Sequence, residues 1–209
     1  MPRFLVANGL VEYVTALQTM GEIIDQVRSG EDEVVWFLEH PPIYTAGTSA
    51  KAADLLHERF PVHQSARGGQ YTYHGPGQLI VYVMLDLKKR NNDVRAFVQG
   101  LETWVIQTMA SFGLLGKCKP ERIGVWLDDG NIERKIAAIG VRVTKGVTWH
   151  GLSLNVSPNL SHYSGIVPCG LQGSGVTSLL TEGISVTLPE VINIMQAGAN
   201  NCGLFQAAV

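Results

Sequence analysis

A glycine-rich run, RGGQYTYHGPGQ at residues 67–78, constrains this chain more than any other segment. It holds four glycines, one proline, one arginine and one histidine, and the apolar residues 79–85 follow directly. Because glycine tolerates positive φ and lacks a Cβ, such a run can bring bare backbone N–H and C=O groups against an extended ligand. Gly75-Pro76-Gly77 alone is typical of an ordinary turn. With Arg67 and His74 beside it, the run predicts either a ligand slot or a tight hairpin.

The chain lacks the sequence patterns of nucleotide, nucleic-acid and membrane sites. Neither GxxxxGK[ST] nor GxGxxG occurs, so nothing in the run argues for a nucleotide phosphate. A net charge of −2 argues against a globally basic nucleic-acid binder. The longest apolar run, 79–85, is far shorter than the roughly 20 residues of a membrane helix, and residues 1–9 lack a signal-peptide core. We expect a cytoplasmic protein with no nucleic-acid or membrane partner.

The spacing of apolar residues predicts an α/β (α+β) fold. Helical spacing predicts three helices, over 11–28, 93–112 and 188–199, the second capped by Asp93 and closed by Gly113. Apolar runs predict five strands, the last three as a meander: 34–38, 79–87, 123–127, 135–143 and 147–156. No linker or composition shift divides the chain, so we expect one domain over residues 1–209. Helices that bracket a run of strands indicate a mixed sheet.

The three cysteines, Cys118, Cys169 and Cys202, are widely spaced and form no CxxC pair, so we expect neither a disulfide framework nor a zinc site. Cys169 follows a proline and precedes a glycine in a loop-like stretch. Proline fixes the approach and glycine leaves the following backbone open, so a carbonyl could reach the sulfur beside a main-chain N–H. The alternative is a buried, inert thiol. We expect that inert state for Cys118 and Cys202.

Lys135 lies at the start of an apolar strand face. Alternation over 135–143 places it on one side with Ala137, Ile139 and Val141. A lysine there ordinarily extends its ammonium to the strand end, where water solvates it. The alternative is a partly desolvated amine that serves as a general base or as the partner of a thiolate. A nearby ammonium would favour ionisation of a thiol, which at its ordinary pKa is only about 3% thiolate at pH 7.

The histidines give weaker signals. His74 adjoins the glycine-rich run, and ligand contact and structural hydrogen bonding are equally compatible with that position. His150 shares a face with Leu152 and Leu154 by alternation, which predicts a satisfied core or pocket histidine. His40 and His162 show no metal-ligand spacing, so we expect no metal site.

Four segments, taken together and in order, resemble one known family. They are the run at 67–78, RKIAAIGVR at 134–142, WHGLSLNV at 149–156 and PCGL at 168–171. In this order they look like an octanoyltransferase of lipoate biosynthesis, and the resemblance extends from about Val35 to Leu180. It implies a single α/β domain like the catalytic domain of biotin and lipoate protein ligases, with a large mixed sheet and a smaller one.

The resemblance also implies a reaction. The family moves an octanoyl (or lipoyl) group from the phosphopantetheine thioester of acyl carrier protein to a lysine of a lipoyl domain, without a cofactor. The implied acceptors are the lipoyl domains of 2-oxoacid dehydrogenase complexes and the glycine cleavage carrier protein. Cys169 would be the nucleophile, and Lys135 would lower its pKa and shuttle protons. The implied acyl pocket comprises Arg67, Gly68, Gly69, Gln70, Tyr71, Thr72, Tyr73, His74, Ala138, Ile139, Gly140, Gly151, Leu152 and Ser153.

Three other functions stay open at this point. An ATP-dependent lipoate ligase of the same fold would make an adenylate and need no cysteine. A cysteine thioesterase would turn over without an amine acceptor. A non-enzymatic module that binds acyl carrier protein would leave Lys135 and Cys169 incidental. The Pro-Cys-Gly loop and the run at 67–78 favour transfer, whereas the residues after Leu180 match no motif that assigns them a role.

Overall fold

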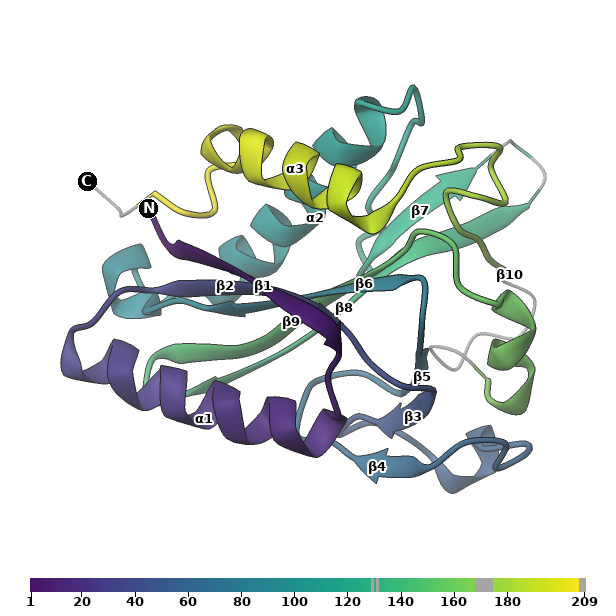
Figure 1. Ribbon diagram of the computed structural model, residues 1–209, viewed down its shortest axis with the longest axis horizontal. Coiled ribbons are helices and arrows are strands. Elements are labelled where there is room, and N and C mark those ends of the chain that lie inside the picture. Colours follow the sequence, from purple (N-terminus) through teal and green to yellow (C-terminus); the bar gives the residue numbers. More distant parts are fainter. Residues whose placement is uncertain (129, 131, 168–174, 207–209) are drawn as a thin grey trace.

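The computed structural model describes residues 1–128, 130, 132–167 and 175–206 (Figure 1). These residues form three α-helices and ten strands, with short 3-10 turns between them. In chain order the elements are β1 (Arg3–Leu10), α1 (Tyr13–Ser29), β2 (Val34–Glu39), β3 (Ile43–Ala46), η1 (Ala52–Asp54), β4 (Val62–Gln64), β5 (Tyr71–His74), β6 (Gln78–Met84), η2 (Leu87–Arg90), α2 (Val94–Ala110), β7 (Val125–Asp128), β8 (Glu133–Thr144), β9 (Val147–Asn155), η3 (Leu160–Gly165), β10 (Gly175–Val176), α3 (Leu188–Gly198) and η5 (Ala199–Asn201).

A seven-stranded mixed sheet forms the centre of the structure. Six strands follow the order β1-β2-β6-β9-β8-β10, and β7 pairs with β8 beside them. The pairs β1–β2 and β8–β10 are parallel, whereas β2–β6, β6–β9, β7–β8 and β8–β9 are antiparallel. Lys145 and Gly146, both at positive φ, form the tight turn between β8 and β9. The predicted meander of β7, β8 and β9 is confirmed.

β8 is longer than the strands beside it. β7 pairs with its residues up to Ala137, and β9 pairs with residues 137–144. Beyond Ala137, therefore, β9 alone among the described strands pairs with β8. There the backbone N–H of Gly68 donates to the carbonyl oxygen of Val141 at 3.0 Å. The glycine-rich run thus closes against the otherwise open stretch of β8.

Helices cover both faces of the sheet (Figure 1). Trp36 of β2 packs in the cluster that α1 covers, and its neighbour Phe37 packs in the cluster with α2 and α3, as the alternation of a strand buried on both faces requires. The indole N–H of Trp104 in α2 donates to the carbonyl of Met195 in α3 at 2.8 Å and joins the two helices. None of the described helices has the length and apolar character needed to cross a membrane.

The second sheet has three strands in the order β4-β3-β5. β3 runs parallel to β4 and antiparallel to β5. Aromatic rings fill the space beneath it, with ring centroids 6.1 Å apart for Tyr44 and Tyr73 and 5.5 Å apart for Phe60 and Tyr73. A large mixed sheet, a smaller sheet and covering helices confirm the predicted α/β (α+β) class.

The predicted elements differ from the observed ones in specific places. Asp93 caps α2 as expected, accepting a hydrogen bond from the N–H of Ala96 at 2.9 Å. The strand predicted over 79–87 ends instead at Met84, because the Asp86 carboxylate accepts from the N–H of Lys88 and starts the η2 turn. The sequence patterns do not reveal β1, whose apolar run is short and whose side chains are mostly exposed. They also do not predict the smaller sheet as strands.

Candidate functional site

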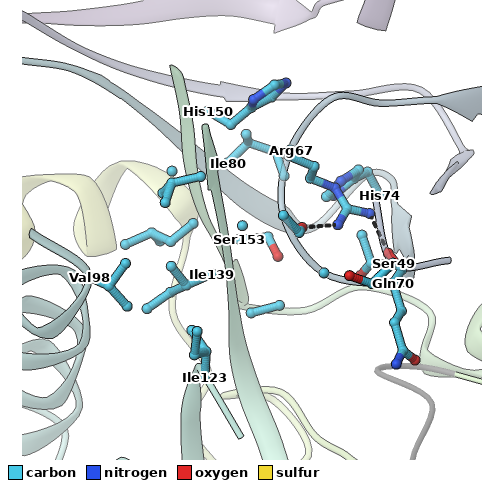
Figure 2. A pocket seen from close by; sticks show the side chains of 18 of the residues that line it. Ser49, Arg67, Gln70, His74, Ile80, Val98, Ile123, Ile139, His150 and Ser153 are labelled. Atoms are coloured by element: carbon cyan, nitrogen blue, oxygen red, sulfur yellow. Dashed lines mark hydrogen bonds between the residues drawn. The ribbon is translucent and has the colours of Figure 1, made fainter. Parts of the chain in front are cut away.

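A cavity of about 620 Å³ lies where the glycine-rich run meets β8 and β9 (Figure 2). Fourteen of the residues expected at the site line it: Arg67, Gly68, Gly69, Gln70, Tyr71, Thr72, His74, Lys135, Ala138, Ile139, Gly140, Gly151, Leu152 and Ser153. Tyr73, although expected there, is not among the residues that line the cavity. Its ring is buried among the aromatic side chains of the smaller sheet, and its hydroxyl hydrogen-bonds Nδ1 of His162 at 2.8 Å.

The cavity has an apolar side and a polar side. Val98, Ile123 and Ile139 lie on one side of the strands that cross it, and Arg67 and His74 lie on the other (Figure 2). Val141 and His150, which lie within the motifs, also line the cavity, and nine residues that the sequence motifs miss complete the wall: Tyr13, Ser49, Ile80, Tyr82, Val94, Val98, Glu121, Arg122 and Ile123. They come from separate segments and share no local motif. Only the alternation of β6, which places Ile80 and Tyr82 on one face, could have signalled two of them.

Close backbone contacts require glycine at two lining positions. A Cβ on Gly151 would lie 2.2 Å from the carbonyl oxygen of Val81 on the neighbouring strand. A Cβ on Gly140 would lie 3.0 Å from the carbonyl oxygen of Gly68. A larger residue at position 151 would push the strands apart, and one at position 140 would force the glycine-rich run to shift by a few tenths of an ångström. At these positions the wall of the cavity is main chain rather than side chain.

Arg67 fixes the glycine-rich run to the smaller sheet. It is 8% exposed, and its guanidinium donates to the carbonyl and hydroxyl of Thr45 at 2.7 Å and 2.8 Å. It also donates to the carbonyls of Gly68 and Gln70 at 2.9 Å and 2.8 Å. The planar guanidinium reaches all these acceptors at once. Arg67 therefore positions the run in addition to lining the cavity.

Replacing Arg67 by lysine should destabilise the protein by about 3 kcal/mol, because an ammonium cannot satisfy these acceptors together and leaves buried carbonyls without donors. Urea unfolding measures the change in the free energy of unfolding. Arg59→Lys is the matched control, since Arg59 contacts Ser161 and Ser164 at the exposed surface and should lose less than about 0.5 kcal/mol. Equal losses in the two variants would contradict the positioning role of Arg67.

Three buried histidines on the polar side are neutral. Burial lowers the pKa of His40 to about 4, and its Nδ1–H donates to the carbonyl of Val11 at 2.6 Å while Nε2 accepts from the Tyr82 hydroxyl at 2.7 Å. Burial, then the charges of nearby groups, lowers the pKa of His74 well below its ordinary value. His74 donates to Gln78 through Nδ1 at 2.7 Å. His74 therefore makes a structural hydrogen bond and also lines the cavity, and its contact with a ligand stays a prediction.

His150 differs from its sequence-based prediction. Its φ is 59°, so the strand alternation breaks there, and its ring lies 5.9 Å from that of Tyr82 on the face that α1 covers, not with Leu152 and Leu154. Although it is 3% exposed, neither ring nitrogen has a hydrogen-bond partner among the described residues. Burial, followed by the charge of Arg67, lowers the pKa of His150 to about 3. His150 does line the cavity, as a pocket histidine should, but the prediction that its ring nitrogens are satisfied is wrong.

Stability should fall in mild acid. The unfolded chain binds protons at its histidines near pH 6.5, whereas His40 and His150 in the folded state stay neutral down to about pH 4 and about pH 3. The free energy of unfolding should therefore be level above about pH 6.5 and fall as the pH drops below it. At pH 5 the loss should reach about 2 kcal/mol for each of these histidines. His74, whose pKa is also lowered by burial, should add to this loss of stability in acid.

Urea unfolding at several pH values between 7.5 and 5 measures this loss. His150→Asn is the informative variant, because asparagine tolerates positive φ and does not titrate. Its free energy of unfolding should depend less steeply on pH than that of the native protein. A free energy that does not change between pH 7.5 and pH 5 would contradict the buried neutral histidines.

Lys135 is held inside the site. It is 7% exposed, its Nζ donates to the carbonyl of Ile123 at 3.0 Å, and the ammonium lies 4.6 Å from the centroid of the Trp126 ring. The extension to solvent considered from the sequence is therefore wrong, and the structure supports the partly desolvated amine. The prediction that Ala137, Ile139 and Val141 share one face of the strand is confirmed, since all three pack in the cluster with α2 and α3.

The cysteines have different surroundings. Cys169, the candidate nucleophile, lies outside the described residues. Cys202 is buried, and burial raises the pKa of its thiol, in keeping with an inert role. Cys118 is exposed, so the expectation of a buried thiol is wrong at that position. The lysines on either side of Cys118 engage carboxylates instead, Lys117 with Asp128 and Lys119 with Glu133.

Comparison with known proteins finds octanoyltransferases that match nearly the whole chain. The chain is 54% identical over 201 residues to an octanoyltransferase of Paracoccus denitrificans (strain Pd 1222), an alignment that covers 91% of this chain and 92% of that protein. It is 48% identical over 198 residues to an octanoyltransferase of Wolbachia pipientis wMel, an alignment that covers 94% of this chain and 97% of that protein.

Solved structures show the same fold at low sequence identity. A bipartite lipoate protein ligase of Thermoplasma acidophilum superposes with a TM-score of 0.66 at 18% identity, covering 96% of this chain and 83% of that one. Biotin protein ligase of Aquifex aeolicus superposes with a TM-score of 0.55 at 12% identity, and the superposition covers 97% of this chain and 69% of that one. Residues 12–199 match the sequence profile of the lipoyl protein ligase A/B catalytic domain. The chain therefore belongs to that catalytic-domain family, together with octanoyltransferases that share about half of its residues.

Proposed function

We propose that this protein transfers an octanoyl or lipoyl group from the thioester of acyl carrier protein to a lysine of a lipoyl domain, through an acyl thioester on Cys169. The observation that carries the proposal is the buried ammonium of Lys135 at the wall of a cavity with an apolar side. The cavity volume falls within the range of about 300–1,000 Å³ that is usual for small-molecule sites. The octanoyltransferase names of the relatives support the same reaction.

The first half-reaction forms the acyl-enzyme. The thiolate of Cys169 attacks the thioester carbonyl carbon, and the bond from that carbon to the phosphopantetheine sulfur breaks. The departing thiolate takes a proton from the ammonium of Lys135, so free carrier-protein thiol leaves and Lys135 becomes a neutral amine. Before this step the ammonium favours the thiolate over the thiol of Cys169.

The second half-reaction forms the product amide. The amine of the acceptor lysine attacks the acyl-Cys169 carbonyl, and the carbon–sulfur bond breaks as the amide forms. Lys135, now neutral, takes the proton that the attacking nitrogen releases, which restores the thiolate and ammonium pair. Exchange between thioesters is nearly isoenergetic and conversion of a thioester to an amide is downhill, so neither step requires a nucleotide. One site that serves two protein substrates in turn suits this two-step route.

The acceptors proposed are the lipoyl domains of 2-oxoacid dehydrogenase complexes and the glycine cleavage carrier protein, and the proposed compartment is the cytoplasm. The fold alone does not separate transfer from ligation, because lipoate ligases share it at 18% identity. Octanoyltransferases at about 50% identity favour transfer. A thioesterase would release free octanoate in the absence of an acceptor.

Incubation with octanoyl-acyl carrier protein, without ATP or acceptor, tests the proposal. Intact mass followed by peptide mapping should find one octanoyl group on Cys169, and addition of a lipoyl domain should move it to the acceptor lysine. Octanoate plus ATP, supplied in a parallel reaction, should give no product. Product only in that parallel reaction would identify a ligase, and free octanoate without acyl-enzyme transfer to the acceptor would identify a thioesterase.

A further inference from the structure

A buried carboxylate lies behind the wall of the cavity near Lys135. Glu102 is in the middle of α2, where the neighbouring buried side chains Leu101, Trp104 and Val105 are apolar. It is 7% exposed, and its Oε1 accepts a hydrogen bond from the backbone N–H of Gly124 at 3.0 Å. A buried charge destabilises a protein unless hydrogen bonds or an opposite charge compensate it. The Gly124 N–H alone is weak compensation for a full negative charge.

The compensating charge lies on the far side of the same peptide group. The N–H of Gly124 and the C=O of Ile123 belong to one peptide unit, which is planar and trans. That C=O accepts from Nζ of Lys135 at 3.0 Å. The N–H end of the peptide dipole therefore meets the carboxylate, and the C=O end meets the ammonium. Each hydrogen bond polarises the peptide in the sense that strengthens the other.

The local backbone is adapted to this arrangement. Gly124 has φ of +124°, a conformation that other residues rarely adopt. A Cβ at this position would lie 2.6 Å from the carbonyl oxygen of Ala137 and 3.3 Å from Cε of Lys135. The Trp126 ring also packs against the ammonium, with Nζ of Lys135 at 4.6 Å from the ring centroid. The peptide between Ile123 and Gly124 is thus held in one orientation, with its carbonyl directed at Lys135.

We propose that Glu102 is a positioning residue for acyl transfer, which holds the ammonium of Lys135 in place through the Ile123–Gly124 peptide. The inference rests on the proposed function, because it requires Lys135 to move protons. Glu102 is not among the residues that line the cavity, so it would act on the reaction only through Lys135. Its hydrogen bond orients the peptide whose carbonyl accepts from Nζ of Lys135, and so fixes the direction from which a proton is given and taken back.

Glu102→Gln tests the charge while keeping an acceptor for the Gly124 N–H. Because hydrogen bonds to charged groups are stronger than neutral ones, kcat of both half-reactions should fall about tenfold, with KM for octanoyl-acyl carrier protein within twofold of its native value. Thr108→Val is the matched control. Thr108 is also buried on the same helix, and its hydroxyl donates to the carbonyl of Trp104 at 2.8 Å rather than to the Ile123–Gly124 peptide, so this variant should keep native kcat.

A double-mutant cycle separates positioning from general damage to the fold. In a Lys135→Met background, Glu102→Gln should cause no further loss in single-turnover acylation, because the group it positions is already gone. A tenfold loss that persists in that background, or native kcat in the single variant, would overturn the inference. A native protein that forms no acyl-enzyme would overturn the proposed function instead.

A spectroscopic measurement tests the inference whatever the activity. The ammonium of Lys135 should give a ¹H–¹⁵N correlation, assigned by its absence from Lys135→Met, since buried and hydrogen-bonded ammonium protons exchange slowly with water. In Glu102→Gln that signal should shift and broaden. A signal that is unchanged in Glu102→Gln would show that the carboxylate does not position the ammonium.

Discussion

Replacing Cys169 by alanine should abolish acyl transfer, with a loss of a thousandfold or more in both acylation and overall turnover. The methyl group of alanine cannot form the thioester that links the half-reactions, and removal of a covalent nucleophile costs rates of this order or larger. Single-turnover reactions with octanoyl-acyl carrier protein, read by intact mass, measure the effect. The native protein should gain one octanoyl group, and the variant should gain none.

Cys118→Ser is the matched control for this experiment. It removes an exposed thiol from the same chain and leaves Cys169 in place, so both half-reactions should keep native rates. An octanoyl adduct on Cys169→Ala, or turnover of that variant near the native rate, would refute covalent catalysis at this position. The function would then have to be sought in direct transfer between the two protein substrates.

Replacing Lys135 by methionine should slow both half-reactions by about 10²–10⁴-fold, the usual contribution of a general acid–base group. Methionine has a similar length and its sulfur packs well against aromatic rings, so it should occupy the place of the ammonium beside Trp126. The folded state should therefore persist, with an unchanged circular dichroism spectrum. Slowing of both half-reactions, rather than one, follows because the same group gives a proton first and takes one later.

Lys117→Met is the control for Lys135→Met. Lys117 is 56% exposed in its side chain and lies 3.8 Å from Asp128, a surface ion pair that contributes little. This variant should transfer octanoyl groups at the native rate. If Lys135→Met slowed the second half-reaction alone, its role as the proton donor to the carrier-protein thiolate would be refuted.

The sequence predicts those parts of the fold that have a strong internal period. The helices and the core strands follow the apolar spacing, because each must bury one face or both against the sheet layers. β1 and the smaller sheet have no such signal, since β1 is largely exposed and the strands of the smaller sheet are only three or four residues long. Their formation depends on neighbours far away in the chain.

The site, like the fold, has some features that a local sequence pattern predicts and others that depend on residues far apart in the chain. The lining residues inside the four motifs are predictable, because the motifs are contiguous and come from one recognisable pattern. Two features depend instead on long-range geometry. The backbone of His150 leaves the strand alternation, with φ of 59°, and no local residue announces that change. Glu102 interrupts the apolar face of its own helix, and only the position of Gly124, brought near by folding, explains a carboxylate there.

The closure of the glycine-rich run on β8 has a consequence for behaviour in concentrated solution. The stretch of β8 beyond Ala137 carries backbone donors and acceptors that no described strand other than β9 pairs with, and Gly68 covers part of it. An uncovered strand edge is a template for pairing with another chain. Displacement of the run, as in Arg67→Lys, should therefore open both the ligand cavity and an aggregation-prone edge. Selection for a working pocket and selection against self-association would act on the same twelve residues.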